Sequence, residues 1–161
     1  DMLGDDIPPC ELNRLAEGGE GAHYGFPFLW GDNQPDPEFG ERAPELEFVK
    51  PFVNFDAHVA PLGCHFPKVE SLRKAHPSKI FTAQHGSWNR SEPIGYQVVT
   101  VDLKTKAVEP FLWGFLDKSN GDVHGRPVDV AELADGTLLV SDDHAGVIWA
   151  VKTQTATEEP K

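Results

Sequence analysis

The chain has 161 residues and a formal net charge of −12 at pH 7, because 26 acidic side chains outnumber 14 basic ones. Such an acidic chain repels phosphate backbones and anionic membrane surfaces, which disfavours nucleic-acid binding, and its apolar stretches are too short to span a bilayer. Its 15 glycines and 14 prolines, spread without a Gly-X-Y period, exclude collagen and long helices, whereas a hydrophobic fraction of 39% is enough for a packed core.

The first quarter of the chain is predicted to be mostly loop. Pro8 and Pro9 exclude a central strand there, because proline lacks the amide hydrogen that a sheet ladder needs. Residues 11–15 alternate apolar and polar side chains and predict one short strand. An aromatic run over residues 23–30 then leads into a second loop.

The second half of the chain is predicted to consist of short strands separated by turns. Asp135-Gly136 between two alternating runs is a strong signal for a hairpin. Helical periodicity is confined to one or two turns within residues 68–75. Together these patterns favour an antiparallel all-β fold. The predicted strands cover residues 79–84, 96–102, 107–112, 127–133, 137–142 and 146–151.

A half repeat points to a particular all-β architecture. Residues 80–85 and 138–143 are both strands that end in polar side chains, and each is followed by a glycine-containing turn and a further strand starting at Gly95 or Gly146. This pattern is typical of propeller blades, whose repeats span roughly 40–50 residues. A closed propeller needs at least four blades and this chain supplies only about three. A β-sandwich is the alternative fold.

Residue spacing disfavours several other kinds of site. Ser87 does not lie in a Gly-x-Ser-x-Gly elbow, and the sequence contains no phosphate-binding glycine loop. Cys10 and Cys64 allow either one disulfide or two free thiols. The scattered histidines show no zinc-like spacing and are expected to be structural or exposed. They are His23, His58, His65, His76 and His144.

The densest group of chemically versatile side chains follows the predicted strand at residues 79–84. Residues 84–91 offer an arginine fork that suits carboxylates, a tryptophan face for stacking, and histidine and asparagine side chains on one loop. The alternative interpretation is a polar turn whose Asn and Ser side chains cap the backbone. The candidate site residues in this group are His85, Trp88, Asn89 and Arg90.

Two smaller groups carry weaker signals. Arg126 directly precedes a predicted strand and could reach an anionic ligand, although a surface ion pair explains it at least as well. Asp5 and Asp6, with Glu11 and Asn13 nearby, offer the oxygen ligands that calcium prefers, although acidic turns are common.

Taken together and in order, these stretches resemble one known family, the soluble glucose/sorbosone dehydrogenases that use pyrroloquinoline quinone (PQQ). The run at residues 84–90 is similar to the sorbosone-dehydrogenase-like branch in particular. The similar stretches extend over nearly the whole chain. They are residues 1–9, 11–13, 23–27, 60–63, 83–90, 125–130, 138–143 and 145–148.

The resemblance implies a C-terminal portion of a six-bladed β-propeller that holds PQQ and calcium at the top of its central channel. Loops of such a propeller supply basic and amide side chains to the three PQQ carboxylates. Tyr24, through its backbone carbonyl, falls in the segment that lines a second, structural calcium site in some members. The implied cofactor-binding residues are His85, Trp88, Asn89, Arg90, Arg126, Asp5 and Asp6.

The implied reaction is the oxidation of a sugar or alcohol, of the aldose or sorbosone type, by hydride transfer to the quinone. The family's general base and the turn that holds the quinone-bound calcium lie upstream of the matching segment. The catalytic residue is therefore unknown, and this piece alone is expected to be inactive. Val128 stands where glucose-oxidising members have a second arginine, which leaves the substrate open.

The resemblance also implies an electron acceptor such as a cytochrome or a quinone, and a periplasmic or extracellular location. Residues 1–152 are expected to form the partial propeller domain, and residues 153–161 a polar tail. Two alternatives to the dehydrogenase remain. One is a calcium-dependent propeller lactonase or hydrolase, and the other is a non-enzymatic carbohydrate-binding propeller domain.

Overall fold

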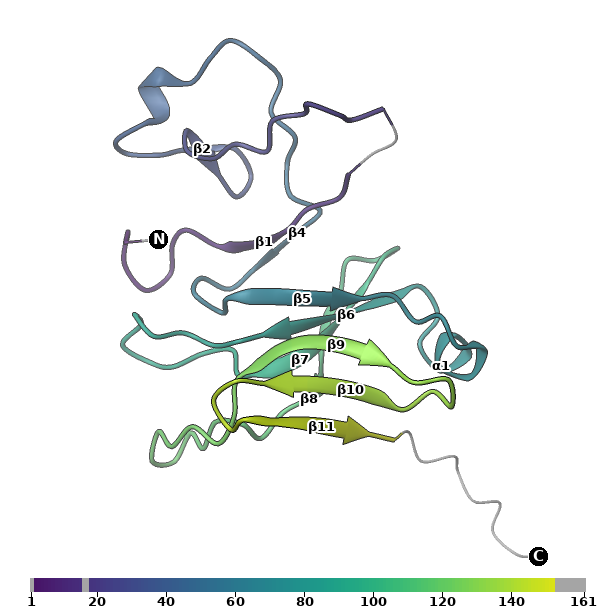
Figure 1. Cartoon of the computed structure of the whole chain (residues 1–161). Coiled ribbons are helices and arrows are strands. Elements are labelled where there is room, and N and C mark those ends of the chain that lie inside the picture. The colour runs from purple at the N-terminus through teal and green to yellow at the C-terminus, as the bar shows by residue number, and fades with distance from the viewer. Residues whose placement is uncertain (1, 16–17, 153–161) are drawn as a thin grey trace, which may run out of the picture. The chain divides into compact units, whose positions relative to one another are not determined.

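The computed structural model describes residues 2–15 and 18–152, and its elements are almost all strands (Figure 1). The helical segments are α1 (Glu70–Ala75) and a 3-10 turn at Gly40–Arg42. The strands are β1 (Cys10–Leu12), β2 (Leu29–Trp30), β3 (Gln34–Pro35), β4 (Val53–Phe55), β5 (Pro61–His65), β6 (Lys79–Gln84), β7 (Gln97–Asp102), β8 (Val108–Leu112), β9 (Pro127–Glu132), β10 (Leu138–Asp142) and β11 (Val147–Val151). The predicted all-β fold class is confirmed.

The chain divides into two compact units, each of which is described by itself. Unit 1 comprises Asp1–Pro61 and Gly86–Gly95, and unit 2 comprises Leu62–His85 and Tyr96–Lys161. Unit 1 contains short ladders and loops, whereas unit 2 contains the long strands. Among the described residues, no helix is long and apolar enough to cross a bilayer.

Two sheets build unit 2. One has four strands in the order β5-β6-β7-β8, and the other has three in the order β9-β10-β11. The pair β6–β7 is antiparallel, and so is the pair β10–β11, so the half repeat predicted from the sequence is confirmed. In the repeat, β11 corresponds to β7. Strand β7 pairs with β8 on its outer edge, whereas β10 is the only described strand that pairs with β11.

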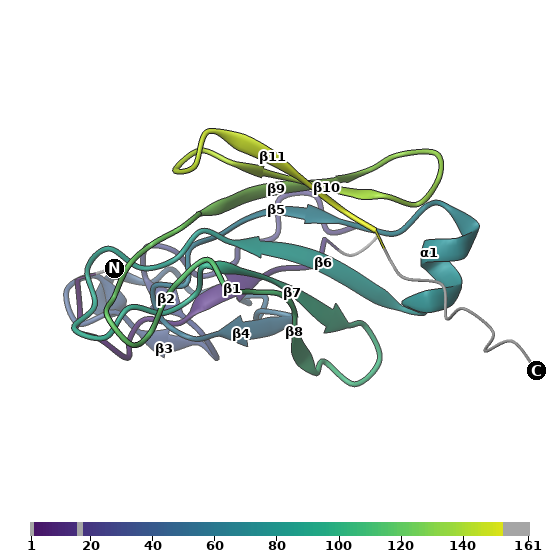
Figure 2. The same ribbon diagram turned by 90° about the horizontal axis from the view of Figure 1, so that it is seen from below.

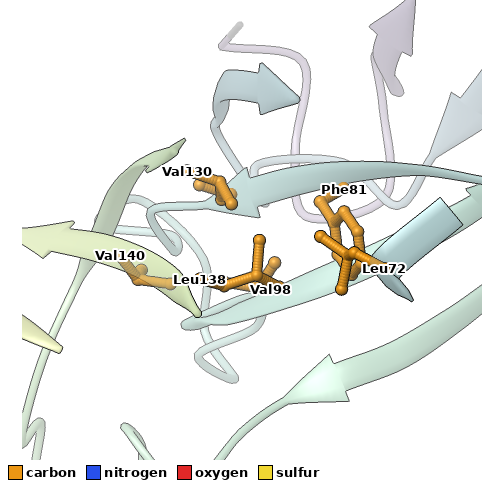
Figure 3. Close-up of a cluster of buried hydrophobic side chains, with 7 residues drawn as sticks. Leu72, Phe81, Val98, Val130, Leu138 and Val140 are labelled. Carbon is orange, nitrogen blue, oxygen red and sulfur yellow. The ribbon is translucent and has the colours of Figure 1, made fainter. Parts of the chain in front are cut away.

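The core of unit 2 lies between these two sheets. Figure 2 shows the β9–β10–β11 sheet lying over the four-stranded sheet, with α1 near one end. Alternating residues of β10 are buried and half-buried, as expected for a strand with one covered face. Figure 3 shows the side chains that meet there. The cluster consists of Leu72, Phe81, Ala83, Val98, Val130, Leu138 and Val140, none of which exposes more than 3% of its surface.

A six-residue helix such as α1 is too short to be stable alone. The side chain of Glu132, which is almost fully buried, holds its start in place. The backbone N–H groups of Lys68 and Val69 donate to Oε1 of Glu132, at 2.8 and 2.7 Å. His65 Nε2 lies 3.1 Å from Oε2 of the same carboxylate. Burial alone raises the pKa of Glu132, but these hydrogen bonds outweigh burial and lower the pKa. Glu132 therefore remains an anion that ties the start of α1 to β9.

Unit 1 is organised mainly by contacts between side chains and backbone. Its two ladders, β1–β4 and β2–β3, contain two or three residues per strand. Glu11 Oε1 accepts the Gly31 N–H at 2.7 Å and so joins the two ladders. His58 Nε2 donates to the Gly4 carbonyl at 2.7 Å, and this bond fixes the N-terminal loop. Its buried hydrophobic residues are confined to Val53, Phe55, Ala57 and Val59 among the described residues.

The predicted elements agree with the structure best in unit 2. Strand β6 has the predicted bounds, and the Asp135-Gly136 turn joins two paired strands, β9 and β10. The strand predicted over residues 11–15 ends at Leu12, and Leu15 is 80% exposed. Strands β2, β3, β4 and β5 were not predicted, and β3 lies in a segment that was expected to be loop. The predicted tail at residues 153–161 lies outside the described residues, and both cysteines are free thiols.

Candidate cofactor site

The loop at residues 86–95, in unit 1, closes on itself through Ser87. Its N–H donates to the Ile94 carbonyl at 2.9 Å, and the Ile94 N–H donates back to Ser87 Oγ at 3.0 Å. Gly95 has a φ of +90°, and a Cβ there would lie 2.9 Å from the Cα of Gly86. Glycine is therefore required where the two ends of the loop meet. The closed loop presents Trp88 with 74% of its surface exposed, so one ring face is open to a planar ligand.

Arg90 is drawn toward the N-terminal acids. Its guanidinium donates to the backbone carbonyl of Asp5, and Nη2 donates to Asp6 Oδ1 at 2.8 Å. The Ser91 N–H donates to the Asp5 carboxylate at 3.2 and 3.3 Å. Hydrogen bonds from the Ser91 side chain and then from its backbone N–H lower the pKa of Asp5, and the charge of Arg90 contributes further. The structure thus brings Asp5, Asp6 and Arg90 together, and Arg90 forms an ion pair with Asp6.

Asn89 and Tyr24 are the other predicted site residues in unit 1. Asn89 Nδ2 lies 3.8 Å from the sulfur of Met2. The Tyr24 hydroxyl donates to the Arg14 carbonyl at 3.2 Å, which anchors the segment whose carbonyl was predicted to face calcium. The calcium role of that carbonyl stays a prediction.

Arg126 lies in unit 2, immediately before β9, and its side chain is steered by two groups. Nε donates to the His85 carbonyl at 3.0 Å, and the guanidinium carbon lies 5.3 Å from the centre of the Tyr96 ring. Its backbone N–H donates to Asp142 Oδ1 at 3.0 Å. The arginine is therefore fixed at both its backbone and its side chain. Sequence reasoning selected Arg126 and His85, and the structure places them in direct contact.

The imidazole of His85 is held by a residue that sequence reasoning did not select. Nε2 lies 2.8 Å from Oδ1 of Asp143, and the hydrogen bond from His85 lowers the pKa of that carboxyl. Because an ionised carboxylate only accepts, Nε2 carries the proton and donates. A shallow depression of 410 Å³ borders Asp143, with Val128 and Ile148 in its wall.

Asp142 is the second acid that sequence reasoning missed. It is buried, and its Oδ1 accepts the N–H groups of Arg126 and Ala145, at 3.0 and 2.9 Å, while Oδ2 accepts Nε1–H of Trp149 at 2.9 Å. Burial raises the pKa of Asp142, but these donors outweigh burial and lower the pKa. The Ser-Asp-Asp ending of β10 was visible in the sequence and is the signal that could have found both acids.

A metal site built from side chains is not found in residues 2–15 and 18–152. No group there of three or more His, Cys, Asp or Glu side chains could hold a metal ion. The predicted calcium group near the N-terminus has other partners: Asp5 and Asp6 bind the segment around Arg90, and Glu11 binds Gly31 and Asn13.

The comparisons with known proteins agree on one family. A family model described as TrAA12-like matches residues 20–154. An uncharacterized protein of Borreliella burgdorferi is 42% identical over 157 residues, which cover 94% of this chain and 41% of that protein. A pyrroloquinoline quinone-dependent pyranose dehydrogenase of Coprinopsis cinerea is 31% identical over 129 residues, which cover 65% of this chain and 16% of the enzyme.

Solved structures show the same fold at lower sequence identity. A calcium structure of a Trichoderma reesei carbohydrate-active enzyme of family AA12 has a TM-score of 0.72 and 23% identity, covering 92% of this chain and 44% of the other. The holo form of the pyranose dehydrogenase PQQ domain from Coprinopsis cinerea gives 0.69 and 23%, covering 94% and 46%. The chain thus spans less than half the length of these relatives, and its fold is part of a propeller. The TrAA12-like match does not support the sorbosone-like branch that the sequence suggested, so that branch stays a prediction.

Proposed function

The chain belongs to the TrAA12-like family, and we propose that it is a C-terminal portion of a PQQ-dependent dehydrogenase that oxidises a sugar or another alcohol. The similarity to the PQQ-dependent pyranose dehydrogenase of Coprinopsis cinerea carries this proposal. The fixed arginine in unit 2 supports it, because a guanidinium held at both ends suits a carboxylate of the cofactor.

The residues present fit a planar, tricarboxylic cofactor in chemical type. In unit 2, Arg126 offers donors for carboxylate oxygens, whereas the ring N–H of His85 is already donated to Asp143. In unit 1, the exposed side chain of Trp88 is of a type that stacks on a planar ring. PQQ, when bound, would supply the acceptor for a hydride from the substrate carbon, and these residues would orient the cofactor. Arg90 is a weaker candidate, because Asp6 already occupies its guanidinium and a cofactor carboxylate must displace that partner.

Calcium fits less well than PQQ. The described side chains form no cluster of metal ligands, so a calcium role depends on backbone carbonyls such as that of Tyr24. We propose Tyr24 for a structural calcium site because the family resemblance implies that its backbone carbonyl lines such a site in some members, and no catalytic step depends on it.

The finer parts of the proposal concern substrate, acceptor and location. We propose an aldose or a sorbosone-like sugar as substrate, and a cytochrome or a quinone as electron acceptor. The proposed location is periplasmic or extracellular. The general base belongs to a part of the protein upstream of these residues, so the 161-residue chain with PQQ and calcium should not reduce a dye in response to sugar.

Binding of PQQ to the full chain tests the proposal directly. We expect saturable binding by calorimetry, and a loss of about tenfold or more in affinity for Arg126→Ala, because a charge-assisted hydrogen bond is removed. Arg73→Ala, in the last turn of α1, is the matched control and should bind as the wild type does. Wild-type protein that binds no PQQ contradicts the proposal, and hydrolysis of a lactone without added quinone would favour the hydrolase alternative.

A further inference from the structure

Two neighbouring carboxylates, Asp142 and Asp143, lie at the end of β10, and the function proposed above assigns no role to either. Their surroundings differ: Asp142 is only 4% exposed, whereas the side chain of Asp143 is 64% exposed. Each of them contacts a different candidate cofactor residue.

Asp142 fixes the backbone of Arg126 by accepting its N–H. The groups that contact its carboxylate, the N–H groups of Arg126, Ala145 and Trp149, are donors, and a carboxylate accepts from several donors at once without competing hydrogens of its own. Gly125 makes the approach possible, because a Cβ at that position would overlap the Asp142 carboxylate. An amide at position 142 would turn an N–H₂ group toward one of these donors and break the arrangement.

Asp143 determines how the ring of His85 is oriented. The hydrogen bond at 2.8 Å places the proton on Nε2 and turns Nδ1 away from the carboxylate. The carbonyl of the same histidine accepts Nε–H of Arg126. The contacts thus form a ring of linked residues. Asp143 bonds the His85 ring, the His85 carbonyl bonds Arg126, and Arg126 bonds Asp142, which is the chain neighbour of Asp143.

We propose that Asp142 and Asp143 are positioning residues that together fix Arg126 for an anionic ligand: Asp142 holds its backbone N–H, and Asp143 holds His85, whose carbonyl accepts Nε–H of Arg126. The proposal rests on the function proposed above, in which that ligand is the set of PQQ carboxylates. Neither acid is expected to touch the ligand, because like charges repel. Their role is to hold a long side chain and a ring in place before binding, so that less freedom is lost when the ligand arrives.

Nuclear magnetic resonance of the full chain without cofactor tests the positioning itself. In Asp143→Ala, the ring nitrogens of His85 should change from a single Nε2–H form to a mixture of forms. Asp143→Asn should restore the single form, because its amide oxygen accepts the same hydrogen bond. In Asp142→Asn, the backbone N–H of Arg126, which donates to Asp142 in the wild type, should exchange with water at least about tenfold faster. Trp149→Phe is the control, because it removes one donor from Asp142 and leaves the Arg126 contacts in place.

Calorimetric titration with PQQ gives the functional readout. Affinity should fall about tenfold in Asp142→Asn and about threefold to tenfold in Asp143→Ala, and should stay near wild type in Asp143→Asn. If every variant binds PQQ as well as the wild type, the inference fails and the proposed function stands. If the wild type binds no PQQ, the proposed function fails, and the resonance data alone decide whether the acids position the two residues.

Folding of the variants is checked by thermal melting. Should Asp142→Asn fail to fold, the exposed pair Asp143→Ala and Asp143→Asn still decides the matter. Unchanged His85 resonances in Asp143→Ala, in a folded protein, overturn the proposal.

Discussion

Unit 1 and unit 2 achieve order in different ways. Unit 2 buries a continuous apolar cluster between two sheets, so its strands are long and hold each other through packing. Unit 1 has ladders of two or three residues, and its loops are fixed by hydrogen bonds such as those of Glu11 and Arg90. The contrast shows that a regular core and a set of polar anchors can coexist in one chain, with different sensitivities to substitution.

The largest effect should come from the core of unit 2. Phe81 is fully buried, and Phe81→Ala should lower the free energy of unfolding by about 3–5 kcal/mol, because it removes apolar contacts and leaves a cavity. Phe66→Ala, at a side chain that is 54% exposed, is the control and should cost far less. Urea unfolding measures both. Equal losses in the two variants would mean that the sheets are not held by this cluster.

A smaller loss is expected at the anchor of α1. Glu132→Ala removes the acceptor of two backbone N–H groups and should cost about 3 kcal/mol. Glu70→Ala on the same helix breaks only an exposed pair with Lys74, which is worth about 0.3–0.5 kcal/mol. Thermal or urea unfolding distinguishes the two variants. Similar stabilities would show that α1 does not depend on its carboxylate anchor.

Unit 1 should respond more locally. Glu11→Ala should cost about 1–2 kcal/mol, because the Gly31 N–H loses its acceptor. Hydrogen exchange at the Gly31 amide should accelerate while the amides of β6 and β7 stay protected. Glu20→Ala, at an exposed turn, is the control. Faster exchange throughout β6 and β7 would contradict the distinction between the units.

The smallest effect concerns acid pH. The pKa of Asp142 is lowered in the folded chain, so its stabilising contribution is complete above the ordinary value of 3.8 and is lost as pH falls through the lower, folded-state value. The melting temperature of the wild type should therefore fall more steeply below about pH 4 than that of Asp142→Asn. Parallel curves for the two proteins would show that this carboxylate is not preferentially ionised in the native state.

The sequence predicts the regular strands well and the anchors poorly. Residues 79–84 combine a β-branched and aromatic run with flanking turns, so local preference and tertiary packing agree. Strand β5 escaped prediction because Pro61-Leu62-Gly63 looks like a turn. Gly63 is needed there for a tertiary reason, since a Cβ would overlap Asp129.

The candidate site also contains residues that the sequence predicts and residues that it does not. Arg126 and His85 were selected because their chemistry is visible in one loop or at one strand end. Their partners Asp142 and Asp143 were not assigned, because the pairing of His85 with an acid 58 residues away depends on how β6 and β10 are brought together. Local patterns therefore identify side chains that can bind a ligand, and only the fold reveals those that hold them.

The exposure of β11 has a consequence for the handling of this chain. Val147, Ile148 and Trp149 are 43%, 68% and 40% exposed, on a strand whose only described pairing is with β10. An apolar strand with unsatisfied backbone groups is a template on which other chains can stack, so concentrated solutions should become turbid with time. A lysine on this strand, as in Ile148→Lys, should keep such solutions clear without altering the melting temperature, because charge on an edge strand opposes stacking and Ile148 contributes little to the core.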